Sequence, residues 1–595
     1  MRVLSEREKE LLLGNEAVVR GALEAGVGVA TTYPGTPASE IGDTFSKIAE
    51  EVGMYFEYSS NEKVALEVAA GAAISGVRSL VSFKHFGLNV ASDSLFPLAY
   101  LGVKKGMVVV FSDDPNCWSS AQSEQDSRYY ARIAHLPLFE PSEPREAKEM
   151  VKKAFDISEE YGIPVLVRLT TRVSHTRGVV ELGKIKEPEV KGSFEKGIVY
   201  RNFPPKIVET HAELHEKLRK LWEYSNKCEF NFTVDGEGKQ GIVTSGVSYL
   251  YVLDSMKEVG KRLPLLKIGM SYPFPSKLLS SFSEKLESLL VVEELDPVLE
   301  TEVRLSTRKD VHGKDIVPIS GELTPSIVTD SIKRFLGIET KDRKKTKIGR
   351  RKPKLCPGCP YRAVFYAVRK ALGDKIFAGD IGCYMLGIYP PFEEQDFFLS
   401  MGSSISVSHG ISKATEDKPV VFIGDSTFFH AGIPGLINAV HNNGNILVII
   451  MDNTTTAMTG HQPHPGTPFV AGGKSGKMVR IEDVVKACGV DELRIVNSYD
   501  IEGMVKALKE VYGKKGVGVI IARGECRLKM VRRMVRKGLK IEKYRVVDKE
   551  KVNVEELKRL GCPAIIIEGD DVRIDEEMCW GCGVCAKISG GIEKV

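Results

Sequence analysis

Short apolar runs alternate with segments of helical spacing along most of the chain, and residues 419–453 show this pattern most clearly. Residues 420–423 form one apolar run, residues 434–442 have helical spacing, and residues 446–451 form a second apolar run. This order predicts a strand, a helix and a buried strand. In an open sheet such a unit is parallel with a right-handed crossover, so both strands are expected to end at the same edge.

Polar residues follow both predicted strands, namely Asp425 and Asn453, which are 28 positions apart. Ligands bind at this edge of open α/β sheets. Carboxylate and amide oxygens suit Mg²⁺ when phosphates and water complete its coordination, and backbone N–H groups of a loop opening a helix after Gly424 could hold the phosphates. The alternative is that Asp425 caps the helix and Asn453 only turns the chain.

The same alternation recurs in the first 340 residues. Strands are predicted at residues 26–32, 79–84, 106–112 and 163–168, and a second group at 241–245, 265–268 and 289–293. We therefore expect α/β domains with mainly parallel sheets. The second group lacks a polar constellation that would indicate catalysis, so we assign it to packing and subunit contacts.

Composition narrows the function classes. A chain of 595 residues is too long for one core and predicts three or four domains. Its 83 basic and 79 acidic residues leave a net charge of +4, which gives no case for nucleic acid as the main partner. The first ten residues alternate in charge, and no long uninterrupted apolar stretch is present. The sequence therefore predicts a soluble, cytoplasmic protein.

The eleven cysteines are unevenly placed. Cys356 and Cys359 form a C-x2-C pair, whereas Cys579, Cys582 and Cys585 form a C-x2-C-x2-C run. In a cytosolic chain, groups of this kind indicate metal or redox chemistry more than disulfides.

The sequence Gly424-Asp425-Ser426, followed after 26 residues by Asn453, resembles the metal and diphosphate motif of thiamine diphosphate enzymes. With Thr-Gly-His-Gln at residues 459–462, this stretch is most similar to the 2-oxoacid:ferredoxin oxidoreductases. The resemblance implies that Gly424, Asp425, Ser426 and Asn453 bind thiamine diphosphate and Mg²⁺. It also implies that Thr455 lends a backbone carbonyl to the metal.

A predicted strand gives way at Glu62 to a helix rich in Ala and Gly. Alone, Glu62 is explained as a first-turn acid that the helix dipole favours. Thiamine enzymes carry a glutamate at this junction nine residues before a helix glycine, and Glu62 and Gly71 match that spacing. The resemblance implies that Glu62 hydrogen-bonds the aminopyrimidine ring and helps to move a proton, a task worth about 10²- to 10⁴-fold in rate. Glu67 is the weaker candidate.

Three further residues of the first domain are candidates for the substrate side. Thr36, in Tyr-Pro-Gly-Thr-Pro, matches a threonine that approaches the 2-oxoacid in this family. His85 follows a predicted strand and could face the site, and Arg128 could supply the cation that a substrate carboxylate needs. For His85 and Arg128, a structural or solvated role remains the alternative.

A group of cysteines matches iron–sulfur ligands of the family. In other members, a C-x2-C pair, a Gly-Cys after the next strand and a distant cysteine hold a 4Fe–4S cluster beside the thiamine. The matching residues are Cys356, Cys359, Cys383 and Cys526. The alternative is that Cys-Pro-Gly-Cys is a rigid turn and Cys383 a small core residue.

The family usually ends in a ferredoxin-like domain with two C-x2-C-x2-C-x3-C-P runs, in which the fourth cysteine of each run ligates the other cluster. Here the first run keeps only Cys562, and the second keeps Cys579, Cys582 and Cys585 but has Ser589 at its fourth position. By this crossing rule, the remaining cysteines make one complete site. We therefore predict one 4Fe–4S cluster in the tail, with a zinc site as the alternative.

The expected fold class is multidomain α/β, with two thiamine-binding open parallel-sheet domains, a transketolase C-terminal-like domain and a small ferredoxin-like tail. The pyrimidine-binding domain is expected at residues 1–195 and the transketolase-like domain at 196–340. A basic linker follows at 341–354, the diphosphate-binding domain at 355–530, and the degenerate ferredoxin-like domain at 531–595.

The resemblance implies the large subunit of an enzyme that oxidatively decarboxylates arylpyruvates such as indolepyruvate. Electrons would pass through iron–sulfur clusters to ferredoxin, which the basic segment before the tail could dock. Coenzyme A would take the acyl group, and CO2 would leave. The family also implies a smaller beta subunit, in an assembly of two large and two small subunits. One alternative is a non-oxidative thiamine-dependent decarboxylase, against which the cysteine tail argues. Another is an electron-transfer or scaffold subunit with an inactive thiamine site.

Overall fold

The computed structural model describes residues 1–196, 200–340, 352–569 and 571–595. It divides into two compact units, residues 1–345 and 346–595. Of the predicted linker at 341–354, residues 341–351 lie outside the described residues. No helix among the described residues is long and apolar enough to cross a membrane.

The first unit begins with a seven-stranded sheet in the order β12-β6-β7-β5-β4-β2-β3. Its parallel strands are β2 (Val29–Thr32), β3 (Tyr55–Tyr58), β4 (Ser79–Lys84), β5 (Met107–Asp113), β6 (Leu138–Phe139) and β7 (Val165–Thr170). The antiparallel edge strand β12 (Met270–Tyr272) comes from the following domain. β5 and β7 are buried along their whole length, as expected for strands covered on both faces.

Helices follow the strands of this sheet closely, so the polar residues at the strand ends gather at one edge. The helices are α1 (Gly14–Ala25), α2 (Ser39–Val52), α3 (Glu62–Ile74), α4 (His85–Leu101), α5 (Tyr129–Ala134), α6 (Pro144–Tyr161) and α7 (Thr171–His175). A separate antiparallel pair is formed by β1 (Lys9–Leu13) and β8 (Arg177–Glu181).

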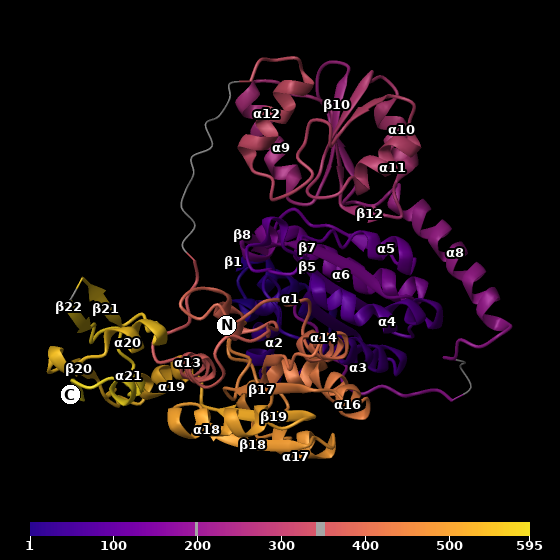
Figure 1. The fold of residues 1–595 in the computed structure, drawn as a ribbon. Helices are drawn as coiled ribbons and strands as arrows, with labels where there is room; N and C mark the ends of the chain where they lie inside the picture. Colours follow the sequence, from indigo (N-terminus) through magenta and orange to yellow (C-terminus); the bar gives the residue numbers. More distant parts are fainter. Residues whose placement is uncertain (197–199, 341–351, 570) are drawn as a thin grey trace. The chain divides into compact units, whose positions relative to one another are not determined.

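The long helix α8 (Lys206–Ser225) leads to a five-stranded sheet in the order β14-β13-β10-β11-β9. Its strands are β9 (Phe232–Val234), β10 (Gln240–Ser245), β11 (Leu265–Ile268), β13 (Ser288–Val292) and β14 (Asp310–His312). Helices α9 (Ser248–Val259) and α12 (Pro325–Phe335) cover one face, and α10 (Ser276–Ser283) and α11 (Val298–Ser306) cover the other (Figure 1).

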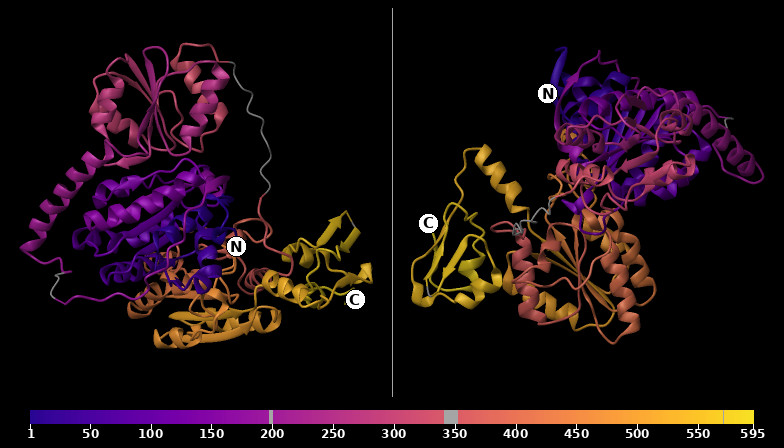
Figure 2. Two further views of the ribbon diagram at one scale, coloured as in Figure 1. Left: turned by 180° about the vertical axis from the view of Figure 1, so that it is seen from behind. Right: turned by 90° about the horizontal axis from the view of Figure 1, so that it is seen from above.

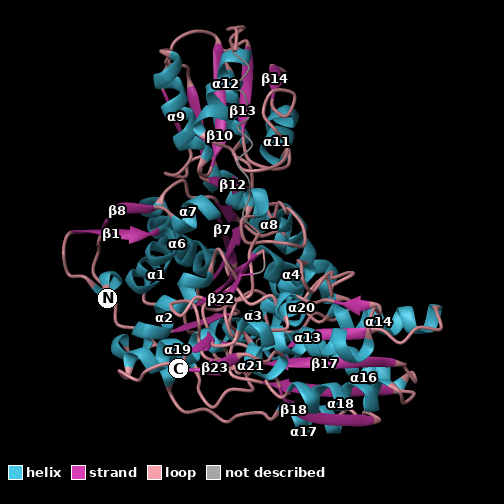
Figure 3. Cartoon of the chain, turned by 60° about the vertical axis from the view of Figure 1, so that its left-hand side comes forward, coloured by secondary structure: helices cyan, strands magenta, loops and turns pink. Residues whose placement is uncertain are grey.

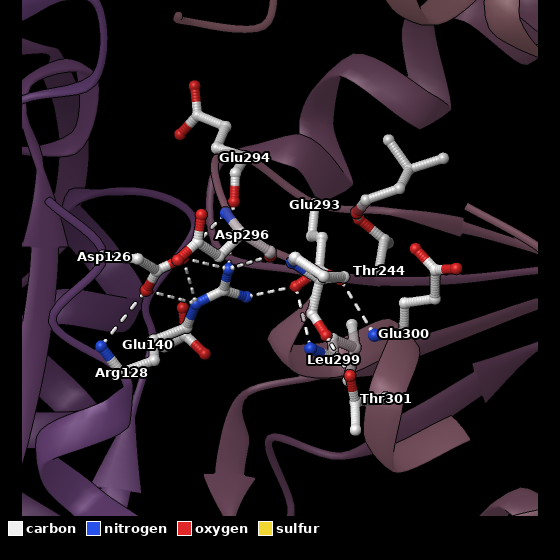
Figure 4. Close-up of polar contacts among 12 residues, drawn as sticks. Asp126, Arg128, Glu140, Thr244, Glu293, Glu294, Asp296, Leu299, Glu300 and Thr301 are labelled. Atoms are coloured by element: carbon white, nitrogen blue, oxygen red, sulfur yellow. Dashed lines mark hydrogen bonds and ion pairs between the residues drawn. The ribbon is translucent and has the colours of Figure 1, made fainter. Parts of the chain in front are cut away.

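A buried ion-pair group joins these two parts of the first unit (Figure 4). The guanidinium of Arg128 pairs with Asp126 at 2.5 Å and with Glu293, which follows β13, at 2.5 Å. It also donates to the backbone oxygens of Glu294 and Asp296 at 2.9 and 3.0 Å. Because Arg128 is only 3% exposed, each of these partners compensates a charge that has left water.

The second unit contains a five-stranded, fully parallel sheet in the order β15-β16-β17-β19-β18. Its strands are β15 (Phe377–Ala378), β16 (Val420–Gly424), β17 (Ile446–Asp452), β18 (Glu492–Asn497) and β19 (Val517–Arg523). One face is covered by α13 (Pro360–Leu372) and α18 (Ile501–Tyr512). The other is covered by α14 (Ser403–Ala414), α16 (Ile433–His441) and α17 (Ile481–Ala487), and the right-hand view of Figure 2 shows the sheet between these layers.

The tail follows α19 (Arg527–Arg536) and contains two antiparallel strand pairs. Figure 3 draws the helices of the tail in cyan and its strands in magenta. β20 (Tyr544–Val546) pairs with β23 (Ile592–Lys594), and β21 (Ile565–Glu568) pairs with β22 (Asp571–Ile574). Helices α20 (Val554–Leu560) and α21 (Val584–Ile588) complete it. Its apolar cluster includes Ala363 and Tyr366 of α13, so the tail packs on the sheet domain of its own unit.

The predicted α/β fold class is confirmed by these mainly parallel, helix-covered sheets. One expected boundary, 530/531, falls inside α19, which continues to Arg536. A basic segment continues through this boundary, and basic composition alone does not show where a helix ends.

The buried ion pairs generate a stability prediction. Arg128→Met removes the cation and leaves Asp126 and Glu293 buried without it, so we expect a loss of about 3–5 kcal/mol in the free energy of unfolding. Denaturant titration of the full chain measures it. Arg132→Met is the matched control, because the Arg132 side chain is 54% exposed in its pair with Glu302 and should contribute less than about 1 kcal/mol. Equal losses in the two variants would contradict this role of Arg128.

Candidate functional site

The carboxyl ends of β16 and β17 bring the predicted metal ligands together. The two strands pair in parallel with Gly424 opposite Met451. Oδ2 of Asp425 accepts hydrogen bonds from the backbone N–H groups of Asn453 at 3.1 Å and Thr455 at 3.3 Å. Oδ1 of Asn453 accepts from the same Thr455 N–H at 3.1 Å. Asp425, Asn453 and Thr455 are all buried, so three oxygen-bearing residues from two strand ends converge.

The chain becomes helical at Asp425 itself, without the loop that we expected after Gly424. A helical turn over Asp425–Thr427 leads into a π-helical turn over Phe428–Gly432 and then into α16. Gly424 is the residue before the helix, so Asp425 occupies its first position instead of the capping position. Its carboxylate is tied to the neighbouring strand end, which argues against a role as a simple helix cap. Single π-helical turns are frequent at functional sites.

Two glycines let a tyrosine ring lie against this edge. A Cβ atom at Gly424 would lie 2.7 Å from Cε1 of Tyr384, and one at Gly382 would be closer still. The Tyr384 hydroxyl donates to the backbone oxygen of Ile381 at 2.9 Å, and the ring is fully buried. The Gly-Asp-Ile-Gly-Cys segment that carries Cys383 is therefore held beside Asp425.

His464 is a buried residue of this edge that we did not predict from the sequence. Its Nε2 lies 3.2 Å from Oδ2 of Asp425. The backbone N–H of Gly466 donates to Nδ1 of the same ring at 3.1 Å. Nδ1 is therefore the acceptor, and Nε2 of the neutral ring carries the proton that points to Asp425. The only hint in the sequence is its place in the same loop as His461, shortly after Asn453.

The first group of cysteines lies at this same edge. Cys356 and Cys359 precede α13, Cys383 follows β15, and Cys526 follows β19. Burial, together with the nearby charges of Cys526, Cys356 and Asp425, raises the pKa of the Cys383 thiol to about 12. The backbone N–H of Cys526 donates to the backbone oxygen of Asn453 at 3.0 Å. The four predicted thiols thus gather next to the oxygen-bearing residues.

The tail cysteines also come together. Cys562, Cys579, Cys582 and Cys585 belong to one apolar cluster of the tail. Burial, together with the charges of the other three cysteines, raises the pKa of the Cys585 thiol to about 12. Ser589, at the position of the missing fourth cysteine, is buried, and its Oγ accepts from the N–H of Asn553 at 2.7 Å.

The Cys-Pro-Gly-Cys turn of the first group lies next to Cys582 of the tail group. A Cβ atom at Gly358 would lie 3.6 Å from Sγ of Cys582. On the same side, Arg362 donates from Nε to the backbone oxygen of Cys356 at 3.1 Å and from a terminal nitrogen to that of Gly561. One buried arginine therefore spans from the first group to the residue before Cys562.

In the first unit, three candidates follow neighbouring parallel strands. Thr36 comes after β2, Glu62 after β3 and His85 after β4, so all three lie at one edge of the sheet. Glu62 is only 6% exposed, which does not fit a solvated first-turn acid. A Cβ atom at Gly87 would lie 2.5 Å from Cγ of Glu62. The first turn of α4 thus presses on the Glu62 side chain, and only glycine leaves room for it.

Burial sets the protonation of two residues near Thr36. Nδ1 of His85 lies 3.2 Å from the backbone oxygen of Ser112, and burial lowers the pKa of His85 to about 4. The neutral ring therefore donates from Nδ1, while Nε2 has no hydrogen-bond partner among the described residues. Lys84, which we did not single out from the sequence, donates to the backbone oxygen of Ser119 at 2.9 Å, and burial lowers its pKa to about 8. Ser119 in turn donates to the backbone oxygen of Thr36 at 3.2 Å.

Arg128 is placed differently from the other candidates. Its guanidinium is buried and taken up by Asp126, Glu293 and two backbone oxygens. These contacts favour the structural alternative over the binding of a substrate carboxylate.

Comparisons with known proteins match two parts of the chain to families of thiamine enzymes. Residues 380–522 match the family "thiamine pyrophosphate enzyme, C-terminal TPP binding domain", and residues 20–216 match the thiamine diphosphate-binding family of pyruvate flavodoxin/ferredoxin oxidoreductases. The indolepyruvate oxidoreductase subunit IorA of Methanothermobacter marburgensis is 47% identical over 98% of this chain and 96% of that protein. The IorA subunit of Archaeoglobus fulgidus is 43% identical over 98% and 97%, and that of Pyrococcus horikoshii is 42% identical over 99% and 97%.

The close approach of Tyr384 gives a prediction for this edge. Gly424→Ala should lower the free energy of unfolding of the second unit by about 1–3 kcal/mol, because the new methyl group overpacks a fully buried ring. Gly410→Ala in α14 is the control, since a Cβ atom there meets nothing within 4 Å and alanine favours the helix by about 0.5–1 kcal/mol. Denaturant titration of both full-length variants tests this. A Gly424→Ala chain as stable as the wild type would contradict the packing.

Proposed function

Because the chain belongs to the family of indolepyruvate oxidoreductase subunit IorA, we propose that it is the thiamine-bearing subunit of an arylpyruvate:ferredoxin oxidoreductase. The observation that carries this proposal is the cysteine group beside Asp425 and Asn453. A metal and diphosphate site alone serves any thiamine decarboxylase, whereas thiols gathered beside it provide for the removal of electrons. The non-oxidative alternative leaves these thiols without a use.

The proposed reaction joins an arylpyruvate, coenzyme A and two oxidised ferredoxins. The bond between the carboxylate and the 2-oxo carbon breaks, and CO2 leaves. The acyl carbon forms a thioester with coenzyme A, whose thiol proton is released. Two electrons pass singly to the ferredoxins, so atoms and charges balance.

Asp425, Asn453 and the backbone carbonyl of Thr455 would hold Mg²⁺ in this proposal. All are hard oxygen donors, which suits Mg²⁺ when diphosphate oxygens and water complete its coordination. Gly424 and Ser426 flank Asp425 and would contact the diphosphate. The Nε2–H of His464, 3.2 Å from Asp425, would orient the carboxylate as partners outside a metal's ligand set commonly do.

Glu62 would exchange a proton with the aminopyrimidine ring. Bound thiamine diphosphate supplies a nucleophilic carbon and an electron sink for decarboxylation. A buried carboxylate at the strand edge, held by Gly87, is suited to hold and return the proton. At the same edge, Thr36 would approach the 2-oxoacid, and the free Nε2 of His85 would accept a hydrogen bond.

Two 4Fe–4S clusters would carry the electrons. Cys356, Cys359, Cys383 and Cys526 would ligate the first, and the ligands of the second would be Cys562, Cys579, Cys582 and Cys585. Thiolates are the usual ligands of such clusters, and all of these cysteines are free. The contact between Gly358 and Cys582 supports transfer from the first cluster to the second.

Partners complete the proposal. The similar proteins are named as subunits, and we propose a smaller beta subunit in an assembly of two large and two small chains. The basic residues of α19 would attract an acidic ferredoxin. Free thiols in such number suit a reducing compartment, which supports a cytoplasmic enzyme.

The activity is tested with a panel of 2-oxoacids, coenzyme A and a viologen dye, using the chain together with its smaller partner. We expect indolepyruvate and other arylpyruvates to reduce the dye with formation of the acyl-CoA. Glu62→Gln should lower kcat by about 10²- to 10⁴-fold while thiamine diphosphate still binds in calorimetry. Glu67→Gln, which alters an exposed residue of the same helix, should keep its activity. CO2 release without dye reduction would favour the non-oxidative alternative, and unchanged turnover in Glu62→Gln would refute the role of Glu62.

A second variant tests the position of Glu62 without changing its chemistry. Gly87→Ala introduces a methyl group 2.5 Å from Cγ of Glu62 and should lower kcat more than it weakens cofactor binding. Gly71→Ala in α3 meets nothing within 4 Å and should act like the wild type.

The clusters are tested by iron and acid-labile sulfide analysis of anaerobically purified protein. We expect about eight of each per chain, as two 4Fe–4S clusters require. Cys562→Ser and Cys526→Ser should each lose about half, because each removes a ligand of a different cluster. Cys488→Ser alters a cysteine outside both groups and should lose none. Zinc without sulfide in the tail would refute the second cluster.

A further inference from the structure

Three histidines of the first unit gather in one place, and none of them is among the candidate-site residues. His135 ends α5, whereas His211 and His215 lie one turn apart on α8. One ring nitrogen from each lies within 4.8 Å of the others. Nε2 of His211 and Nε2 of His215 are 3.1 Å apart. The proposed reaction gives this group no role.

The three rings are oriented so that their edges can share one point. The ring planes of His135 and His211 meet at 84°, those of His135 and His215 at 76°, and those of His211 and His215 at 84°. Three nearly perpendicular planes intersect at one point, and the nitrogen lone pairs lie in these planes. Rings at these angles can each direct one nitrogen to a shared ion, which stacked rings cannot do.

The surroundings hold the rings in this orientation. The hydroxyl of Tyr100 hydrogen-bonds Nδ1 of His211 at 2.7 Å, which leaves Nε2 of that ring facing the group. Second nitrogens of metal-bound histidines commonly have such a partner. His135 has a left-handed backbone, with φ of 57°, which aims its ring from the end of α5.

We propose that His135, His211 and His215 bind one Zn²⁺ ion. Imidazole nitrogens suit zinc, and three protein ligands leave a fourth position for water. Two nitrogens bound to one tetrahedral ion at 2.0–2.1 Å lie about 3.3 Å apart, close to the 3.1 Å between His211 and His215. His215 is exposed, so an ion can enter from solvent. The ion would link α8, which leads to the five-stranded sheet of the first unit, to the end of α5.

Zinc binding is tested on the full chain with its iron–sulfur centres assembled, after chelator treatment and desalting. Titration with ZnCl2 should give one more equivalent for the wild type than for His215→Ala or His211→Ala. His441→Ala, which removes an exposed histidine of the second unit, should bind as the wild type does. Equal stoichiometry in wild type and His215→Ala would overturn the proposal, and because His215 is exposed this variant is expected to fold.

Two further measurements separate the site from cysteines and from a plain hydrogen bond. The zinc absorption edge of the extra equivalent should show only nitrogen and oxygen neighbours, and sulfur neighbours would refute the site. Tyr100→Phe removes only the hydroxyl that contacts His211, and it should weaken zinc binding by about 10- to 100-fold. Unchanged affinity in Tyr100→Phe would contradict the positioning of His211. Neither result depends on whether the proposed oxidoreductase activity is found.

Discussion

The parallel pairing of β16 with β17 is the constraint on which the candidate site of the second unit depends. It places Gly424 opposite Met451 and so brings Asp425 within hydrogen-bonding distance of the N–H groups of Asn453 and Thr455. Those bonds tie the carboxylate to the end of the neighbouring strand. The same edge receives Cys526 through its bond to Asn453. Oxygen donors and thiols therefore share one edge because two strands share one register.

At three positions, a glycine lets a side chain from another part of the chain lie close to the backbone. Gly424 admits the ring of Tyr384, Gly87 admits Glu62, and Gly358 admits Cys582. At Gly424 and Gly87 an added methyl group would meet a buried side chain at 2.7 Å or less, and at Gly358 the nearest contact would be 3.3 Å. These positions determine where functional side chains lie without contributing chemistry of their own.

Burial of charged and titratable side chains explains why residue type alone did not predict the roles of Arg128 and His85. An arginine in a polar stretch can be interpreted as a binding residue for a substrate carboxylate. The Arg128 guanidinium instead donates to Asp126, Glu293 and backbone oxygens. Leaving a guanidinium unpaired inside the protein is costly, so a buried arginine is paired before it is available to a ligand. His85, in contrast to Arg128, keeps a group that a ligand could contact. Burial lowers its pKa to about 4, and Nε2 of the neutral ring has no hydrogen-bond partner among the described residues.

The sequence by itself determined the α/β class, most strand positions and the residues at the strand ends, because apolar periodicity and chain direction are local properties. Asp425 and Asn453 were found in this way, whereas the resemblance to a known family assigned Cys383, Cys526 and Cys562 to the two cysteine groups. Only the tertiary structure decided that α12 and α9 share a face, that β12 joins the first sheet, and that His464 contacts Asp425. It also decided that His135 meets His211 and His215, which lie 76 and 80 positions further along the chain. Such contacts arise from side-chain packing between segments that are far apart in the sequence. A single sequence reveals the periodicity within a segment but not which distant segments pack together.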